Sequence, residues 1–158
     1  MFSFNRINTY IFLFTIIFLG FGCELNNETT SLYNIFKNVQ EFQNKESPIS
    51  ATYSGIHKYN NFMPFNTNND FERRLLFWQK TIEQLNDINI NNLSSDDKIN
   101  YSIFYDMVIG NINKIKFKDY QMPLNADSGF HTGLSRLYKA MPFKTKEDYD
   151  NYINRLNQ

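Results

Sequence analysis

Apolar residues return every three to four positions along most of this chain, and that spacing corresponds to one face of an α-helix. The first such face begins at Leu32, and we predict a helix there with a cap at Thr30 or Ser31. This helix is expected to end before Pro48, because a proline disfavours helical backbone in the residue ahead of it. Its apolar positions are Leu32, Ile35, Phe36, Val39 and Phe42.

A second helix is predicted after Asn69-Asp70-Phe71-Glu72, a stretch with the spacing of a capping box. The periodicity places Arg73 and Arg74 mostly on its solvated side. The apolar side is expected to carry Phe71, Leu75, Trp78, Ile82 and Leu85.

Two further helices are predicted from their starting residues. Ser94, Ser95, Asp96 and Asp97 place a cap and negative charge at one helix start, and Thr145 with Asp148 has capping spacing at the other. The third helix is expected to carry Ile99, Ile103, Phe104, Met107, Val108, Ile112 and Ile115, and the fourth contains Tyr149, Tyr152, Ile153 and Leu156.

The connections between these helices contain proline and glycine. Residues 48–59 are predicted to be irregular, and the chain changes character after Tyr120, where a short amphipathic piece stands between Gly129 and Pro142. We therefore predict a mainly α fold of several amphipathic helices with irregular connections. Because the last apolar face runs to Leu156 without a stop signal, we expect an incomplete amino-terminal portion of a larger helical domain.

The stretch from Tyr10 to Cys23 is apolar, uncharged and shorter than a membrane-spanning helix. Arg6 precedes it, and Gly20 and Gly22 place small residues before the cysteine. We predict a lipoprotein signal peptide at residues 1–22, cleavage between Gly22 and Cys23, and a lipidated Cys23 with a tether at 23–31. An uncleaved membrane anchor with a buried structural cysteine is the alternative.

Composition narrows the possible partners and sites. The chain has 16 basic and 16 acidic residues, so it lacks the positive charge of a nucleic-acid-binding protein. Its single cysteine, once lipidated, leaves no thiol for a disulfide or metal site. We expect one domain at residues 32–158. The lipid is expected to hold it to a membrane of the bacterial cell envelope, either the inner or the outer one.

No recognisable active site stands in the sequence. A zinc peptidase needs two imidazoles on one helical face, whereas His57 and His131 are far apart and lie in loop-like contexts. No nucleophile elbow or phosphate-binding glycine loop is present. We therefore predict no catalytic residue, metal ligand or cofactor in this chain, and we interpret Asp96 and Asp97 as a helix start.

Several short motifs, taken in order, resemble the amino-terminal part of a bacterial family known as domain of unknown function 885. One is the join from Leu85 through Ile88 to Leu93 and Ser94. The resemblance extends from about Leu32 to Leu156. The other residues that carry it are Pro48, Ala51, Thr52, Gly55, His57, Tyr59, Pro123, Leu124, Asn125, Gly129, Met141, Pro142, Phe143, Asp148, Tyr149, Tyr152, Arg155 and Leu156.

The resemblance implies a helical, exported protein of the zinc-dependent His-Glu-x-x-His peptidase class, in which the zinc motif lies far downstream. No residue of this chain matches those ligands, so zinc and a peptide substrate are implied only for full-length relatives. We expect an inactive amino-terminal fragment whose helices expose apolar surface that the remainder covers. The alternative is a small standalone helical lipoprotein acting as an envelope binding or structural module.

Overall fold

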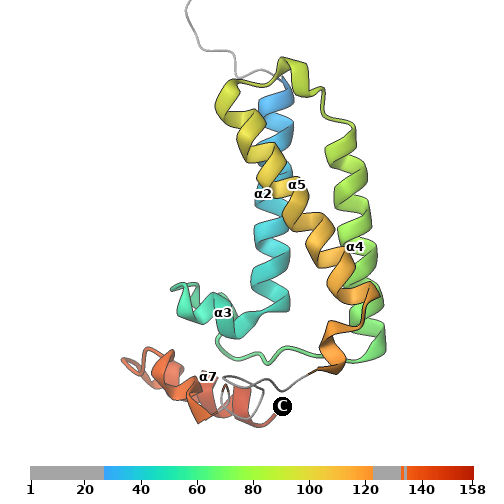
Figure 1. The fold of residues 1–158 in the computed structure, drawn as a ribbon. Coiled ribbons are helices and arrows are strands. Elements are labelled where there is room, and N and C mark those ends of the chain that lie inside the picture. The colour runs from blue at the N-terminus through green and yellow to red at the C-terminus, as the bar shows by residue number, and fades with distance from the viewer. Residues whose placement is uncertain (1–26, 123–132, 134) are drawn as a thin grey trace, which may run out of the picture.

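Three long helices lie side by side and form most of the molecule (Figure 1). In the computed structural model, α2 (Asn27–Glu46) and α4 (Asn68–Asn86) run antiparallel, and α5 (Ser95–Lys116) turns back along α4. The structure describes residues 27–122, 133 and 135–158.

Most of the shorter elements lie at the base of the molecule, whereas η2 joins α4 to α5 at the opposite end of the bundle (Figure 1). Every element of regular structure in the described residues is a helix, so the predicted mainly α fold is confirmed. The short elements are α3 (Pro48–Tyr53), η1 (His57–Tyr59), η2 (Ile90–Asn92), η3 (Asp119–Gln121), η4 (Leu137–Lys139) and α7 (Lys146–Leu156). The segment predicted to be irregular at 48–59 is therefore partly helical, starting with proline at the first helical position, where no backbone N–H is needed.

The core lies between the three long helices and combines the apolar faces that the periodicity predicted. Leu32, Leu85 and Val108 are fully buried, one from each helix. Tyr101 was not predicted to be buried, and its hydroxyl donates to the carbonyl oxygen of Leu85 at 3.1 Å, which satisfies its polar group inside the core. The other buried members are Ile35, Val39, Trp78, Ile88, Leu93 and Ile112.

Helix α2 is already helical at Asn27, five residues before the predicted start at Leu32, so the predicted cap at Thr30 or Ser31 is wrong. Two polar side chains of the first turns of α2 contact α5. Thr29 Oγ1 and Tyr33 Oη each donate to the Asp97 carboxylate at 3.1 Å. A polar partner on a neighbouring helix thus extends α2 beyond its apolar stripe.

The helix starts predicted at Ser94 and Thr145 are confirmed. Each side chain accepts a hydrogen bond from the third residue of its helix, Asp97 or Asp148. The predicted cap of α4 at Asn69 is wrong. The capping box is formed by Thr67 and Asp70, because Thr67 carries the extended backbone that a cap requires.

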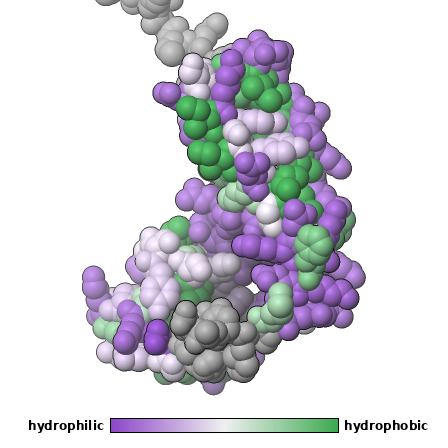
Figure 2. Space-filling view, viewed as in Figure 1, coloured by the Kyte–Doolittle hydropathy of each residue, from purple (hydrophilic) through white to green (hydrophobic). Residues whose placement is uncertain are grey.

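Two apolar residues of the predicted third helix stay largely exposed in α5. Ile99 and Ile103 are 59% and 66% exposed, although they continue the apolar face of the helix. Helices α2 and α4 cover only part of α5, and Figure 2 shows apolar surface among the polar residues of the bundle. The expectation that this chain exposes apolar surface is consistent with these two side chains.

Several predictions fall outside the described residues. They concern the signal peptide, Gly22, Cys23 and His131, together with the motif residues Pro123, Leu124, Asn125 and Gly129. Within the ranges that the structure describes, no helix is both long and apolar enough to cross a membrane.

Candidate functional site

The base of the molecule is organised around the guanidinium group of Arg155, which α7 places completely out of solvent. Its Nη2 donates to the carbonyl oxygen of Tyr59 at 2.7 Å and to Thr52 Oγ1 at 2.9 Å, with a longer contact of 3.4 Å to the carbonyl oxygen of Pro48. One side chain therefore binds both α3 and η1 across about a hundred residues of sequence.

The remaining nitrogens of Arg155 have weaker partners. Nη1 lies 3.5 Å from the sulfur of Met141, and Nε has no hydrogen-bond partner. No ion pair joins Arg155 to a carboxylate of the described residues, and burial lowers the pKa of this guanidinium. The protein thus buries a cation that is compensated mainly by neutral oxygens.

The Arg155 cluster brings together many of the residues that carried the family resemblance. Pro48, Thr52 and Met141 all contact Arg155. Ala51 is 2% exposed beside Thr52. Gly55 ends this segment with a φ of +78°, a conformation that residues with a Cβ rarely adopt, which explains a glycine at that position.

Other residues of the resemblance lie away from this cluster. Tyr149 and Leu156 are 53% and 50% exposed. Phe143, next to the partly buried Pro142, has a φ of +45° and packs its ring against Tyr149 and Tyr152, with ring centroids 4.9 and 5.2 Å apart.

A polar chain continues from Arg155 to His57 through Thr52 and Asn60. Thr52 Oγ1 lies 2.8 Å from Asn60 Oδ1, and Asn60 Nδ2 lies 3.2 Å from His57 Nδ1. Asn60 is 1% exposed, and its burial was not predicted because an asparagine in a polar loop resembles the other asparagines of this chain. His57 is exposed and begins the short helix η1, so the loop-like context expected for it is corrected to a helical turn at the surface.

The loop at residues 59–66, which we call the clamped loop, is held by side chains of α7, of α4 and of Gln158, which follows α7. Beyond the bond from Arg155 to Tyr59, Gln158 Nε2 donates to the carbonyl oxygen of Asn61 at 2.6 Å, and the Met63 amide donates to Gln158 Oε1 at 3.1 Å. At the other end, Arg74 donates to the carbonyl oxygen of Phe65. Four backbone groups of the clamped loop are therefore fixed by side chains.

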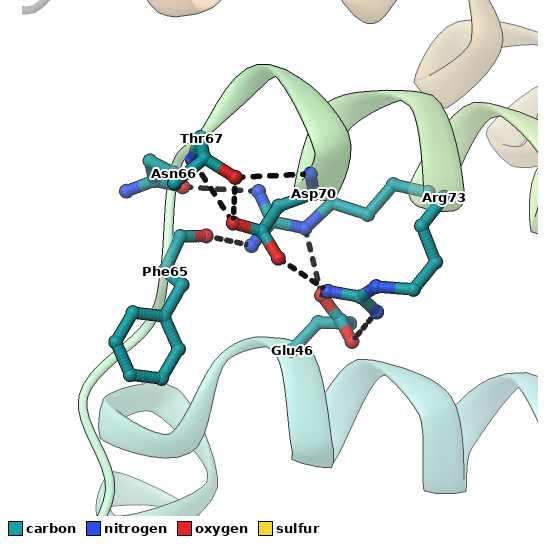
Figure 3. Close-up of polar contacts among 7 residues, drawn as sticks. Glu46, Phe65, Asn66, Thr67, Asp70 and Arg73 are labelled. Atoms are coloured by element: carbon teal, nitrogen blue, oxygen red, sulfur yellow. Dashed lines mark hydrogen bonds and ion pairs between the residues drawn. The ribbon is translucent and has the colours of Figure 1, made fainter.

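Arg74 belongs to an ion-pair network between α2 and α4, shown in Figure 3. Its Nε lies 2.8 Å from Glu46 Oε2, while Arg73 bonds the same carboxylate and also Asp70 at 2.9 Å. Burial alone would raise the pKa of Glu46, but the hydrogen bonds from Arg73 and Arg74 lower it below its ordinary value. The prediction of a solvated arginine pair is wrong for Arg74, whose side chain is 14% exposed.

Two cavities of about 350 Å³ each lie on either side of Pro64 and Glu46. The first is lined by residues of α2, α4, α5, η3 and the clamped loop, with Trp78 and the stacked rings of Phe71 and Tyr120 among its walls. The second lies between the clamped loop and the facing ends of α2 and α4. Sequence periodicity gave no sign of either cavity, because both depend on where the clamped loop runs.

The zinc site implied for longer relatives does not fit the described residues. Among residues 27–122, 133 and 135–158, no three histidine, cysteine, aspartate or glutamate side chains lie close enough to hold a metal ion.

Comparison with known protein families places most of the chain in one family model. The family model described as "Bacterial protein of unknown function (DUF885)" matches residues 48–158. The match begins at Pro48, so α2 lies ahead of it and the resemblance predicted from Leu32 is confirmed only from Pro48 onward. No curated protein and no solved structure matches the chain.

Proposed function

This chain belongs to the DUF885 family of bacterial proteins of unknown function, and from that premise we propose that it is the amino-terminal portion of an exported lipoprotein resembling zinc-dependent peptidases. In this proposal the chain supplies a scaffold and a binding surface, and the zinc ligands and catalytic groups come from a region outside it.

The observation that carries the scaffold role is that Arg155 links the two ends of the region that the family model matches. The matched region starts at Pro48, and the carbonyl oxygen of Pro48 lies 3.4 Å from Arg155 Nη2, near the other end of the match. A fully buried arginine without a carboxylate partner among the described residues suits a structural role, because its donors are used on backbone oxygens and a threonine hydroxyl. Such a unit fixes the positions of elements around it.

The exposed face of α7 supports a further region covering this chain. Tyr149, Ile153 and Leu156 follow one another at helical spacing, and each is about half exposed. An apolar helix face of this kind is typical of a surface that another part of a protein covers.

The test of the scaffold role uses the full chain and its gene. We expect purified chain to bind no stoichiometric zinc and to hydrolyse no peptide, and we expect DNA beyond codon 158 to encode a His-Glu-x-x-His segment in some frame. Zinc-dependent hydrolysis by the chain alone, or unrelated downstream DNA, would contradict the proposal.

Export and lipidation are tested separately at Cys23. We expect labelled palmitate to be incorporated into the wild-type chain, processing to be blocked by globomycin, and Cys23→Ser to abolish both labelling and cleavage. Unchanged processing of the Cys23→Ser variant would overturn the lipoprotein assignment.

A standalone helical lipoprotein is the second candidate, and the bundle supports it. Leu32, Leu85 and Val108 are fully buried without any further domain, so α2, α4 and α5 form a core of their own. A sharp, cooperative thermal transition of the chain, with a stop codon shared by intact genes of related bacteria, would favour this candidate over a fragment.

A further inference from the structure

The clamped loop combines a fixed backbone with exposed aromatic side chains. Its carbonyl and amide groups are bonded by Arg155, Gln158 and Arg74, as described above. Phe62 and Phe65 are nevertheless 45% and 57% exposed. Figure 3 shows the Phe65 ring pointing away from the polar network that holds its carbonyl oxygen.

This arrangement is unusual for a loop that serves only as a connection. Burying a large aromatic side chain away from water lowers the free energy of the protein, so a loop that is free to rearrange would turn such side chains inward. Here the side-chain clamps prevent that. The exposed rings are consequently presented in one preformed arrangement, which lowers the entropy cost of binding a ligand.

The second cavity of about 350 Å³ lies directly beside these rings and opens to solvent. Tyr59, Phe62, Pro64 and Phe65 form an apolar wall. Its volume is near the lower end of the range for small-molecule sites and suits a single large side chain. Aromatic walls favour an aromatic occupant, because rings stack in offset or edge-to-face geometry.

The rim of the cavity also carries cationic side chains. Lys45, at the end of α2, is exposed and makes no ion pair with any residue that the structure describes. Arg73 lies on the same rim with its side chain 49% exposed. Glu46 also lines the cavity, but Arg73 and Arg74 already bind its carboxylate. The charge that remains for a ligand at the rim is therefore the ammonium group of Lys45.

We propose that this cavity binds the carboxy-terminal residue of a peptide, with an aromatic side chain against the clamped loop and the free carboxylate at Lys45. The open mouth leaves room for the rest of the peptide to extend into solvent, which favours a peptide end over an isolated small acid. This inference does not depend on the proposed catalytic region, because all its residues lie in this chain.

The test measures binding of a fluorescein-labelled Gly-Gly-Phe peptide with a free carboxylate to the full chain by fluorescence anisotropy. The same peptide with a terminal amide, and a Gly-Gly-Ala peptide, serve as matched ligands. We expect the amide to bind several-fold more weakly through loss of the Lys45 contact, and the alanine peptide about tenfold more weakly through loss of the aromatic contact.

Two variants locate the site, and both change side chains that are exposed. Phe62→Ala should weaken binding about tenfold, and Lys45→Gln should remove the preference for carboxylate over amide. Leu76→Ala, a residue of α4 that is 66% exposed and does not line this cavity, is the control and should bind as wild type.

Three results would overturn the inference. They are equal affinity for the acid and the amide, unchanged binding by Phe62→Ala, and binding of 3-phenylpropionate as tight as the peptide, since the last would identify a site for free aromatic acids. Circular dichroism of each variant, matched to wild type, verifies that a change in affinity reflects the site itself.

Discussion

Replacing Arg155 with methionine tests whether this buried arginine holds the base of the molecule together. Methionine has a similar length and an apolar body, so Arg155→Met removes the charge and all donors while leaving little empty space. Thr52 Oγ1 keeps other partners, since it lies 2.9 Å from the Pro48 carbonyl oxygen and 2.8 Å from Asn60 Oδ1. The Tyr59 carbonyl oxygen loses its bond to Arg155.

The size of the effect follows from two opposing contributions. The two short bonds from the charged guanidinium contribute roughly 1.5 to 3 kcal/mol each, and a buried carbonyl left without a donor costs about 1 to 3 kcal/mol. The variant also avoids the cost of burying a charge, which is several kcal/mol, and this offsets part of the lost stability. We expect a net loss of about 3 kcal/mol in the free energy of unfolding, or a fall in Tm of about 10 °C for a chain of this size.

Two measurements check the prediction. Calorimetry of wild type and variant gives Tm, and amide hydrogen exchange reports opening of the clamped loop at Met63, whose amide is bonded to Gln158. Arg136→Met is the matched control, because the Arg136 side chain is exposed, and it should change stability by no more than about 0.5 kcal/mol. If Arg155→Met melts at or above the wild-type temperature with unchanged exchange at Met63, the buried guanidinium is not what holds the base.

Three further predictions concern the bundle. Leu85→Ala should lower the free energy of unfolding by about 2 to 5 kcal/mol because Leu85 is fully buried, whereas Leu76→Ala, on the exposed side of α4, should be near neutral in the same urea titration; equal effects would place the core elsewhere. Thr67→Ala should cost about 1 kcal/mol by removing the cap of α4, measured as a lower urea midpoint, and an unchanged midpoint would refute the cap. Hydrogen bonds from Thr67 and Arg73 lower the pKa of Asp70 to about 2. The ionised carboxylate therefore contributes its full share to the free energy of unfolding above the ordinary carboxyl pKa, and this share is lost as pH falls from about 4 to about 2. Asp70→Asn should therefore flatten stability against pH in that range, and an unchanged acid slope would contradict this assignment.

The elements that sequence reasoning placed correctly are those decided by local interactions. Ser94 and Thr145 cap their helices because a side-chain oxygen reaches a backbone amide three residues away. The misplaced cap of α4 was also a local matter. Asn69 and Thr67 are both good capping residues, and only the extended backbone of Thr67 decides between them.

The candidate site was predicted only in part. The family resemblance singled out Pro48, Thr52, Met141 and Arg155, and the structure brings these four together. Their common role could not be inferred from spacing, because Thr52 and Arg155 are 103 residues apart. The clamped loop was missed entirely, since it depends on backbone groups that carry no sequence signal.

The sequence by itself determined the mainly α class, the approximate helix positions and most of the core, because a period of 3.6 residues already assigns one face of each helix to the interior. Only the tertiary structure decided which faces find a partner. It leaves Ile103 on α5 exposed, buries Arg155 and draws Arg74 against Glu46. The physical reason is that burial depends on which elements become neighbours, and contacts between distant segments are set by the packing of the whole chain rather than by local propensity.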